Sequence, residues 1–577
     1  MFKNLIIFLF ILASGYSTVS AQWSNNTGVN NPLVIAPYNQ AGVKSIPDGD
    51  DGVILVWEDN RTVSTGNRDI YAQRINKFGV RQWGDSTGIP IAIKINEDER
   101  YYDICSDGKG GAIIVWDDNI TAPRTILKGQ RITKSGTKLW SDTGKVVIND
   151  GNRQSQSKIS YDNNGGCFIA YLTSELSSND YEVKANRLDS NGNKLWGAGT
   201  FICQAEGNAS DIEACATSDN GFFVVWSDPR DSKFTWSDLF CQKLSSTGSV
   251  LWQANGVALC NANYTQQYER CIPDNSGGAF IVWNDNRNSD SITTRVDIFC
   301  QRMNRNGAPV FGANGKALCT VPESQYRPDP VSDMKGGVIV NWNDFRNGPS
   351  APFNIDIYAQ RFDSLGNMKW AANGILVCDA VLSQNNNRGV SDGNYGSIIT
   401  WDDRRAGTSI YDIYAQRIDS NGTLQWGSDD ILVSNAAGNQ YSPKIVKTSD
   451  GAILCFEDTR TGLNDYNLYT MKILNNGGLV GVNQSGSETV NNFSLQQNYP
   501  NPFNPVTTIK YEIKNSAFVQ LKVYDVLGNE VAQLINEKQN TGAYQIKFNG
   551  SSLASGVYFY KLVSDNFSEV RSMILLK

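Results

Sequence analysis

The sequence predicts an all-β protein: an eight-bladed β-propeller with split-blade closure, followed by a small immunoglobulin-like (Ig-like) β-sandwich. Two observations predict the propeller. A pattern of glycine, three apolar residues and W-x-D-x-R recurs in eight registers, and apolar residues alternate with a period of two within them, as in "GGAFIVWND" at 277–285. Helical spacing is nowhere sustained, so each register is expected to supply about four short strands.

One aromatic residue anchors each register. The anchors are Trp57, Trp116, Tyr171, Trp226, Trp283, Trp342, Trp401 and Phe456, separated by 59, 55, 55, 57, 59, 59 and 55 residues. Thirteen of the fourteen tryptophans fall in this column or in a second column after a later turn, and only Trp236 falls outside. Large apolar side chains at repeated positions are expected to pack between neighbouring sheets.

The N-terminal segment is expected to complete the last blade. "WSNNTGVNNPLVIA" from Trp23 matches "WGDSTGIPIAI" from Trp83, the last strand of a unit, whereas the eighth unit ends after its third strand at "NLYTMKILNNGG". A blade shared between the two ends of the chain is typical of a circular propeller. We therefore assign the propeller to residues 22–482.

Two repeated motifs are interpreted as architecture. The turn "DSNGTLQW" at 419–426 has the pattern D-x-x-G-x-x-x-W, which resembles the Asp-box turns of sialidase-like propellers. The Asp and Arg of W-x-D-x-R recur in most units, whereas a catalytic site is singular. We expect these residues to anchor loops through Asp-to-backbone and Asp-to-Arg bonds.

A column of charges lies thirteen residues before the anchors, on the strand expected nearest the propeller axis. It reads Lys44, Asp103, Lys158, Glu213, Arg270, Asp329, Arg388 and Pro443. The signs alternate, so we expect a ring of inter-blade ion pairs that helps to specify blade order, with Pro443 separating Arg388 from Lys44. The functional alternative is a charged channel site for a small anion or sugar.

Composition excludes several functions. The net charge is −7 without a basic block, which argues against nucleic acid as a partner. Histidine is absent, so Ser-His-Asp and Cys-His mechanisms are excluded, while carboxylate-only glycoside hydrolysis remains permitted. "DGDDG" at 48–52 is a hairpin turn in register rather than a calcium loop, and we expect no metal or other cofactor. The eleven cysteines are interpreted as buried thiols in preference to a disulfide framework.

Recognition is expected on the segments between the second and third strands, where the repeat varies. Four aromatic residues there form a candidate ligand surface for carbohydrate or protein: Phe234, Trp236, Phe353 and Tyr411. No catalytic residue is assigned.

The N-terminus predicts export. Lys3, the apolar run 5–12 and the small residues 19–21 indicate a signal peptide over residues 1–21, and no later stretch approaches the length of a transmembrane helix.

The C-terminus predicts a separate module. A polar linker is expected over 483–492 and a sandwich of about seven strands over 493–577. "NYPNPFNP", the strand-turn "VYDVLG", the hairpin "LASGVYFYKL" and the basic end closely resemble the C-terminal sorting domain of type IX secretion substrates, an Ig-like module. The resemblance implies type IX secretion machinery as a partner, and release from the cell or attachment to its surface.

These observations favour a secreted or surface-displayed propeller that binds a glycan or protein without catalysis. The alternatives are a glycan-cleaving enzyme of sialidase-like architecture and a purely structural surface component.

Overall fold

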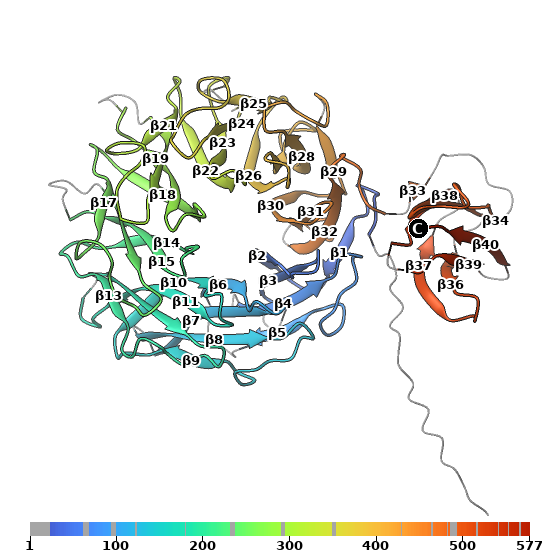
Figure 1. Ribbon diagram of the computed structural model, residues 1–577, viewed down its shortest axis with the longest axis horizontal. Coiled ribbons are helices and arrows are strands. Elements are labelled where there is room, and N and C mark those ends of the chain that lie inside the picture. Colours follow the sequence, from blue (N-terminus) through green and yellow to red (C-terminus); the bar gives the residue numbers. More distant parts are fainter. Residues whose placement is uncertain are drawn as a thin grey trace, which may run out of the picture. The chain divides into compact units, whose positions relative to one another are not determined.

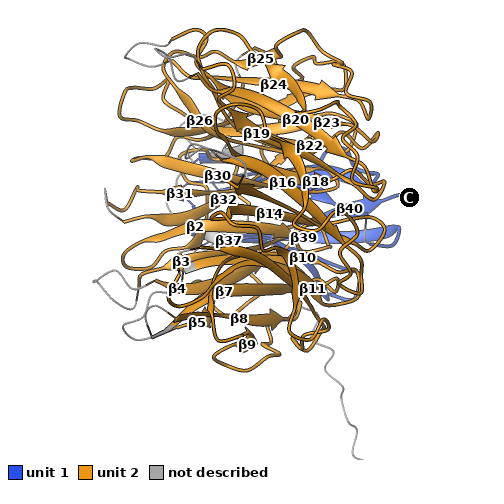
Figure 2. Ribbon diagram, turned by 90° about the vertical axis from the view of Figure 1, so that its left-hand side faces the viewer, with its two compact units in different colours: residues 1–22, 481–577 blue, residues 23–480 orange. Residues whose placement is uncertain are grey.

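The structure of the protein is a computed structural model. It describes residues 23–61, 68–93, 100–121, 124–178, 180–230, 237–289, 295–348, 354–428, 430–462, 465–481, 483–484, 493–514, 517–539, 542–551, 553–564 and 567–577. The chain divides into two compact units, which meet in sequence between residues 480 and 481 (Figure 2). The predicted signal peptide and residues 485–492 of the predicted linker lie outside the described residues.

The first unit along the chain, residues 23–480 (orange, labelled unit 2 in Figure 2), contains eight four-stranded antiparallel sheets, numbered here 1 to 8 along the chain (Figure 1). Sheets 1 and 2 consist of β2 (Gln40–Pro47), β3 (Val53–Asp59), β4 (Asp69–Ile75) and β5 (Ile89–Ala92), then β6 (Arg100–Ser106), β7 (Ala112–Thr121), β8 (Arg124–Ile132) and β9 (Lys145–Ile148). Sheets 3 and 4 consist of β10 (Arg153–Tyr161), β11 (Cys167–Ser174), β12 (Glu182–Leu188) and β13 (Thr200–Cys203), then β14 (Ser210–Ala216), β15 (Phe222–Asp228), β16 (Asp238–Leu244) and β17 (Val257–Cys260). Sheets 5 and 6 consist of β18 (Gln266–Pro273), β19 (Ala279–Asp285), β20 (Asp297–Met303) and β21 (Lys316–Cys319), then β22 (Gln325–Ser332), β23 (Val338–Asp344), β24 (Asp356–Phe362) and β25 (Ile375–Cys378). Sheets 7 and 8 consist of β26 (Gln384–Ser391), β27 (Ser397–Asp403), β28 (Asp412–Ile418) and β29 (Ile431–Ser434), then β30 (Gln440–Lys447), β31 (Gly451–Asp458), β32 (Asn467–Leu474) and β1 (Asn31–Val34).

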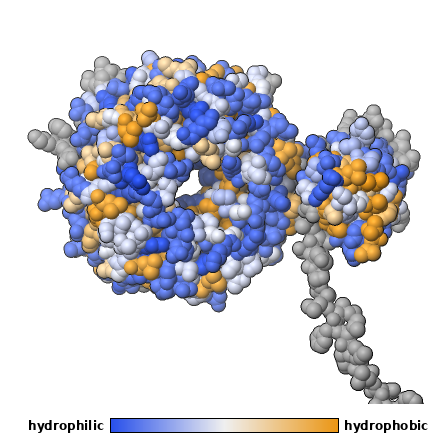
Figure 3. Space-filling model, in the orientation of Figure 1, coloured by the Kyte–Doolittle hydropathy of each residue, from blue (hydrophilic) through white to orange (hydrophobic). Residues whose placement is uncertain are grey.

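The sheets are arranged about a central opening, which is consistent with the predicted β-propeller (Figures 1 and 3). The first strand of each sheet contacts the first strand of the next, and β30 contacts β2. We call the opening that these eight strands surround the central channel. The second and third strands are buried on both faces, as in β19 and β24, because each sheet is covered by its two neighbours.

The N-terminal strand belongs to sheet 8. β1 pairs antiparallel with β32, with Asn31 opposite Thr470. Trp23 Nε1 donates a hydrogen bond of 2.9 Å to Lys77 O in sheet 1, and Trp83 Nε1 donates the same bond to Lys134 O in sheet 2. Trp23 therefore occupies in sheet 8 the place that Trp83 occupies in sheet 1.

Polar residues of the repeated "YAQR" segment are bonded within and between sheets. Gln73 Nε2 donates to Trp83 O and its Oε1 accepts from Trp83 N, both at 2.8 Å, so the glutamine joins the third strand to the turn that follows it. Arg74 Nε donates to Asp48 Oδ2 at 2.9 Å, which holds the first hairpin of the same sheet. The glutamine and arginine of this segment therefore provide hydrogen-bond partners for buried polar groups.

The W-x-D-x-R motif is also architectural. In sheet 5 the fully buried Asp285 accepts hydrogen bonds from Trp283 Nε1 at 2.7 Å and Arg287 Nε at 2.9 Å. The Arg287 guanidinium lies 3.8 Å from the ring centre of Phe299. The same Asp–Arg pair recurs at Asp59, Asp228, Asp344, Asp403 and Asp458.

Glycine in the "DSNG" turns allows neighbouring sheets to approach. Gly422 has a φ of 87°, and a Cβ atom there would lie 3.0 Å from Trp370 in the preceding sheet. Gly79 faces Trp23 in the same way, at 2.9 Å. Any larger side chain would be strained at these positions and would displace a tryptophan.

The second unit contains two four-stranded antiparallel sheets, consistent with a β-sandwich. One has the order β33 (Asn483–Gln484), β38 (Gly542–Asn549), β35 (Val506–Ile513), β34 (Ser494–Leu495), and the other β37 (Glu530–Gln539), β36 (Ala517–Tyr524), β39 (Gly556–Ser564), β40 (Phe567–Leu575). Ile509, Leu521 and Tyr560 lie in its hydrophobic core. Asn483 and Gln484, the first residues of the predicted linker, are paired with β38 and belong to this unit.

All eleven cysteines are free thiols, and ten of them are buried. Among the described residues, no helix has the length and hydropathy needed to cross a membrane.

Candidate functional site

Three of the four aromatic residues predicted as a ligand surface, Phe234, Trp236 and Phe353, lie outside the described residues. The fourth, Tyr411, is partly buried. Its ring lies 4.8 Å from the ring of Tyr441, which in turn lies 6.1 Å from that of Tyr466. Tyr411 is therefore one of a cluster of three tyrosines between sheets 7 and 8.

The predicted charge column lies on the eight strands that surround the central channel. Lys44 pairs with Asp103 at 2.9 Å, and Glu213 pairs with Lys158 at 2.8 Å and with Arg270 at 3.1 Å. Each of these ion pairs joins neighbouring sheets, as predicted.

Two acids of the column also bind backbone groups of the next sheet. Asp103 accepts a hydrogen bond from Ile159 N at 2.9 Å, and Asp329 accepts one from Gly389 N at 2.8 Å. Burial opposes ionisation of Asp103, but the charges of Lys44 and Lys158 keep its pKa below the ordinary value.

The prediction for the eighth position of the column was wrong. In sheets 1 and 7 the column residues Lys44 and Arg388 lie opposite Val56 and Thr400, the residues just before the anchors. In sheet 8 the corresponding Cys455 lies opposite Lys444, not Pro443. The cause is a shorter first hairpin: Thr448 N bonds to Gly451 O, whereas in sheet 1 Asp48 N bonds to Gly52 O. Counting back from Phe456 therefore misses the column by one residue.

A bulge precedes the charge column in every sheet, and sequence reasoning missed it. The ladder between the first two strands shifts register there, and one residue adopts a positive φ of 49° to 67°. These residues are Gly42, Tyr101, Gln156, Asp211, Tyr268, Arg327, Asn386 and Ser442. Only one is glycine, and side chains held in this region of φ are strained and concentrate at functional sites. The only signal in the sequence is their fixed spacing, two residues before the charged column.

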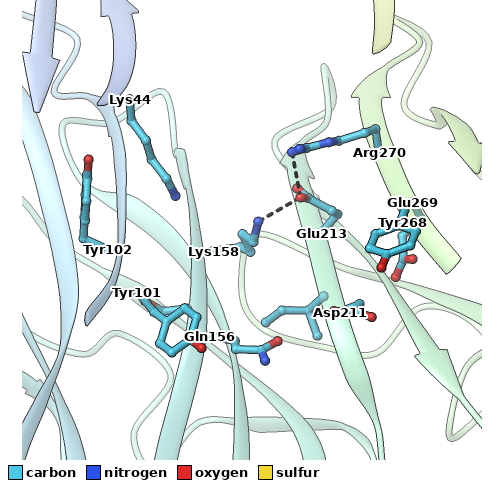
Figure 4. Close-up of a pocket in the computed structure, with 12 residues that line it drawn as sticks. Lys44, Tyr101, Tyr102, Gln156, Lys158, Asp211, Glu213, Tyr268, Glu269 and Arg270 are labelled. Atoms are coloured by element: carbon cyan, nitrogen blue, oxygen red, sulfur yellow. Dashed lines mark hydrogen bonds and ion pairs between the residues drawn. The ribbon is translucent and has the colours of Figure 1, made fainter. Parts of the chain in front are cut away.

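A cavity of about 280 Å³ opens in the central channel beside β2, β6, β10, β14 and β18 (Figure 4). Residues of the bulge and of the charge column line it together, among them Tyr101, Lys158, Asp211, Glu213 and Tyr268. Tyr101 is 61% exposed and Tyr268 is 62% exposed, although both belong to strands. The cavity therefore combines two accessible aromatic rings with charged hydrogen-bonding groups.

One lining residue, Glu269, is a buried carboxyl group. It is 2% exposed, and neither of its carboxyl oxygens has a hydrogen-bond partner. Burial, followed by the negative charges of Asp211 and Glu213, holds the pKa of Glu269 well above its ordinary value. Asp211, on the rim, also has a raised pKa, first because of desolvation and then because of Glu213, while Lys158 acts in the opposite direction.

Two residues at the position of Glu269 in other sheets, Tyr102 and Asn387, donate hydrogen bonds to the preceding sheet. Tyr102 Oη donates to Val56 O at 2.9 Å, and Asn387 Nδ2 donates to Asn341 O at 3.2 Å. The raised pKa favours the protonated form of Glu269, which is the form that can act as a donor. The sequence carries a signal for Glu269: it is the one carboxylic acid in a column that otherwise reads Val43, Tyr102, Ser157, Ile212, Pro328, Asn387 and Pro443.

Within the described parts of the chain, no group of three or more Cys, Asp or Glu side chains has the arrangement of a metal site.

Comparison of the first unit with solved structures finds distant similarities. A protein of unknown function from Dyadobacter fermentans DSM 18053 is 8% identical, with 66% of this chain and 95% of that chain covered and a TM-score of 0.33. An endo-arabinase from Bacteroides thetaiotaomicron is 12% identical, with 52% and 99% covered and a TM-score of 0.27. An α-L-arabinofuranosidase from Fusarium graminearum is 11% identical, with 77% and 97% covered and a TM-score of 0.36. None of these similarities assigns an activity to the chain.

No curated protein matches the chain at a significant level. A family model does match the second unit: the secretion system C-terminal sorting domain matches residues 497–576. This match agrees with the resemblance seen in the motifs of the C-terminal segment. The chain thus ends in a sorting domain of the type IX secretion system, which indicates secretion or attachment at the outer surface of the cell.

Proposed function

We propose that the protein is an exported, non-catalytic β-propeller that binds a saccharide in its central channel. The observation that carries the proposal is the pair of exposed tyrosines, Tyr101 and Tyr268, held at positive φ beside a charged cavity. Aromatic rings stack on the apolar faces of sugar rings, and charged side chains bond to hydroxyl groups. The C-terminal sorting domain provides the route of export through the type IX machinery.

The proposal includes a closed propeller of eight blades in which β1 completes the last one. The pairing of β1 with β32, the contact between β30 and β2, and the bond from Trp23 to Lys77 O support it. A closed ring keeps the first strands at fixed separations, so the channel is a preformed site on a rigid scaffold.

Cleavage of a glycan is the alternative, because the cavity contains carboxyl groups. A hydrolase needs a proton donor and a second carboxylate placed on either side of one glycosidic bond. Glu213 is bound by both Lys158 and Arg270, and it belongs to a column that serves architecture in other sheets. We therefore favour binding.

The test is a glycan array probed with the full-length protein, followed by titration of the best oligosaccharide. Replacing Tyr268 by Ala is expected to weaken binding by about tenfold or more, because a central aromatic contact is lost. Tyr38→Ala is the matched control, since Tyr38 is also exposed, at 47%, and has a φ of 62°, but does not line the cavity.

Equal losses in both variants, or no bound glycan at all, would contradict the proposal and leave a structural surface role. Release of new reducing ends from the bound oligosaccharide, abolished by Glu213→Gln or Glu269→Gln, would establish cleavage instead.

A further inference from the structure

We propose that the central channel contains an anion site, formed by Arg388 and Lys444, that takes the carboxylate or sulfate group of an acidic saccharide. This inference deepens the proposed saccharide binding and rests on it for the identity of the ligand. The anion site itself can be tested separately.

The shorter hairpin of sheet 8 is the origin of the site. Because Lys444 occupies the column position, three consecutive members are cations: Arg388, Lys444 and Lys44. The column as a whole has five cations (Lys44, Lys158, Arg270, Arg388, Lys444) and three acids (Asp103, Glu213, Asp329). The alternation that pairs charges in sheets 1 to 5 therefore breaks down between sheets 7 and 1.

Two of these three cations, Arg388 and Lys444, lack ionic partners. Arg388 Nη1 donates to Asn387 O at 2.7 Å, and Lys444 Nζ donates to Ser442 O at 3.5 Å. Both acceptors are neutral carbonyl groups of the residue's own strand. Within the part of the chain that the structure describes, neither cation has a carboxylate within the 4.0 Å of an ion pair. Lys44, in contrast, is paired with Asp103.

Two acids on the second strands of sheets 7 and 8 are engaged with other groups. Asp402 accepts hydrogen bonds from Asn386 Nδ2 at 2.7 Å and Ser442 N at 3.1 Å, and Glu457 accepts one from Gly42 N at 2.9 Å. These bonds hold the bulges of sheets 7, 8 and 1. Two acids are thus used to fix the backbone, and the cations remain available to a ligand.

Arg388 and Lys444 lie on β26 and β30, which contact each other, and the charge of Arg388 disfavours the charged form of Lys444. Burial, followed by the charges of Arg388 and Arg270, lowers the pKa of Lys444 to about 8, although Glu457 and Cys455 oppose the shift. Burial also lowers the pKa of Arg388, to which Arg270 and Arg327 add, against Asp329 and Asp402. A bound anion would relieve this repulsion in a poorly solvated place, where a charge interaction is strong.

The chemistry of the ligand follows from these groups. A guanidinium binds two oxygens of a planar or tetrahedral oxyanion, and an ammonium group adds a third contact. Arg270 and Lys44 also line the cavity that holds Tyr101 and Tyr268. Arg388 and Lys444 are not among the residues that line this cavity, so a saccharide stacked on the tyrosines must extend along the central channel to present an acidic substituent to them.

The experiment compares saccharides that differ only in charge. The full-length protein is titrated at low ionic strength with a galacturonate tetrasaccharide, with its neutral methyl ester, and with a sulfated galactose tetrasaccharide. We expect at least about tenfold tighter binding of one or both acids than of the ester. Lys444→Gln and Arg388→Gln should reduce this preference to less than about threefold. Lys447→Gln, which removes the same charge from the far end of β30, should retain it.

The two acidic arms distinguish a uronate from a sulfate ester as the source of the anion. Equal binding of acids and ester by the wild-type protein, or an unchanged preference in both channel variants, would overturn the inference while leaving saccharide binding intact. If no saccharide binds, the proposed function fails, and inorganic sulfate then decides the anion site. Sulfate should raise the melting temperature more than chloride at equal ionic strength in the wild type and Lys447→Gln, but not in the channel variants. No difference between the two salts would refute the site.

Discussion

Two buried carboxyl groups of sheet 5 show the difference between the outer and inner parts of the first unit. Asp285 is completely buried and bound by both Trp283 and Arg287, and its arrangement recurs around the unit. Glu269, near the channel, is almost as deeply buried but has no partner, and no other sheet has an acid at its position. The repeated aspartate is thus fully hydrogen-bonded and builds the fold, whereas the carboxyl oxygens of the singular Glu269 have no hydrogen-bond partner.

The largest loss of stability is expected from removing the N-terminal strand β1. This deletion tests whether β1 is an integral part of sheet 8. Deletion of residues 23–36 removes the buried Trp23 and exposes the edge of β32. We expect a loss of more than about 3–5 kcal/mol in the free energy of unfolding, the cost of truncating a buried tryptophan alone, together with aggregation. Denaturant unfolding and size-exclusion chromatography measure both. An unchanged melting temperature with monomeric elution would show that β1 is dispensable.

The next largest loss of stability is expected from removing the carboxylate of Asp285, which is bound by Trp283 and Arg287. Asp285→Ala leaves the Arg287 guanidinium, which is 18% exposed, without its ionic partner, so we expect a loss of about 3–5 kcal/mol in denaturant unfolding. Asp142→Ala, at an exposed turn, is the control and should change stability by less than about 0.5 kcal/mol. Similar small effects of both substitutions would remove the contrast between the two parts of the molecule.

The smallest effect is expected from replacing Glu269, the carboxyl group without a hydrogen-bond partner. Unlike the two changes above, this replacement is expected to increase stability. The folded chain holds the proton of Glu269 to a higher pH than the unfolded chain, whose glutamate ionises near pH 4.3. Stability should therefore fall as the pH rises through the interval between these two pKa values, by up to about 1.4 kcal/mol per pH unit for one proton. Glu269→Gln cannot ionise, so its stability should exceed that of the wild type above this interval and match it below about pH 4.

Melting temperatures of both proteins between pH 4 and pH 8 measure this difference. Glu213→Gln is the control because it removes two ion pairs and should be destabilising at neutral pH. A Glu269→Gln variant less stable than the wild type at pH 8 would show that the carboxylate has a partner in solution.

Much of the architecture could be predicted because it depends on repeated local patterns. The eight anchors mark eight four-stranded sheets, and the pairing of β1 with β32 follows from the match between the segments at Trp23 and Trp83. Seven residues of the predicted charge column share one register, and three ion pairs join five of them. Pro443 does not share this register, because one residue fewer in a hairpin shifts the pairing without changing the anchor.

The candidate site was harder to predict, for a physical reason. The bulge residues share a backbone conformation rather than a residue type: tyrosine, glutamine, aspartate, arginine, asparagine, serine and glycine all occupy it. Side-chain chemistry at Tyr101 and Tyr268 therefore gives no sign of exposure, which results from the bulge itself. The aromatic residues predicted in the outer loops remain a prediction for Phe234, Trp236 and Phe353.

The pairing of β1 with β32 also sets an order of events during synthesis and transport. Asn31 is synthesised early, yet its partner Thr470 follows 439 residues later. Contacts between such distant positions form slowly, because a long loop must close before they can be made. Until then one strand has no neighbour and one sheet has an open edge, both prone to pairing with other chains. Until the last sheet is complete, the exported chain must therefore be kept from pairing with other copies of itself.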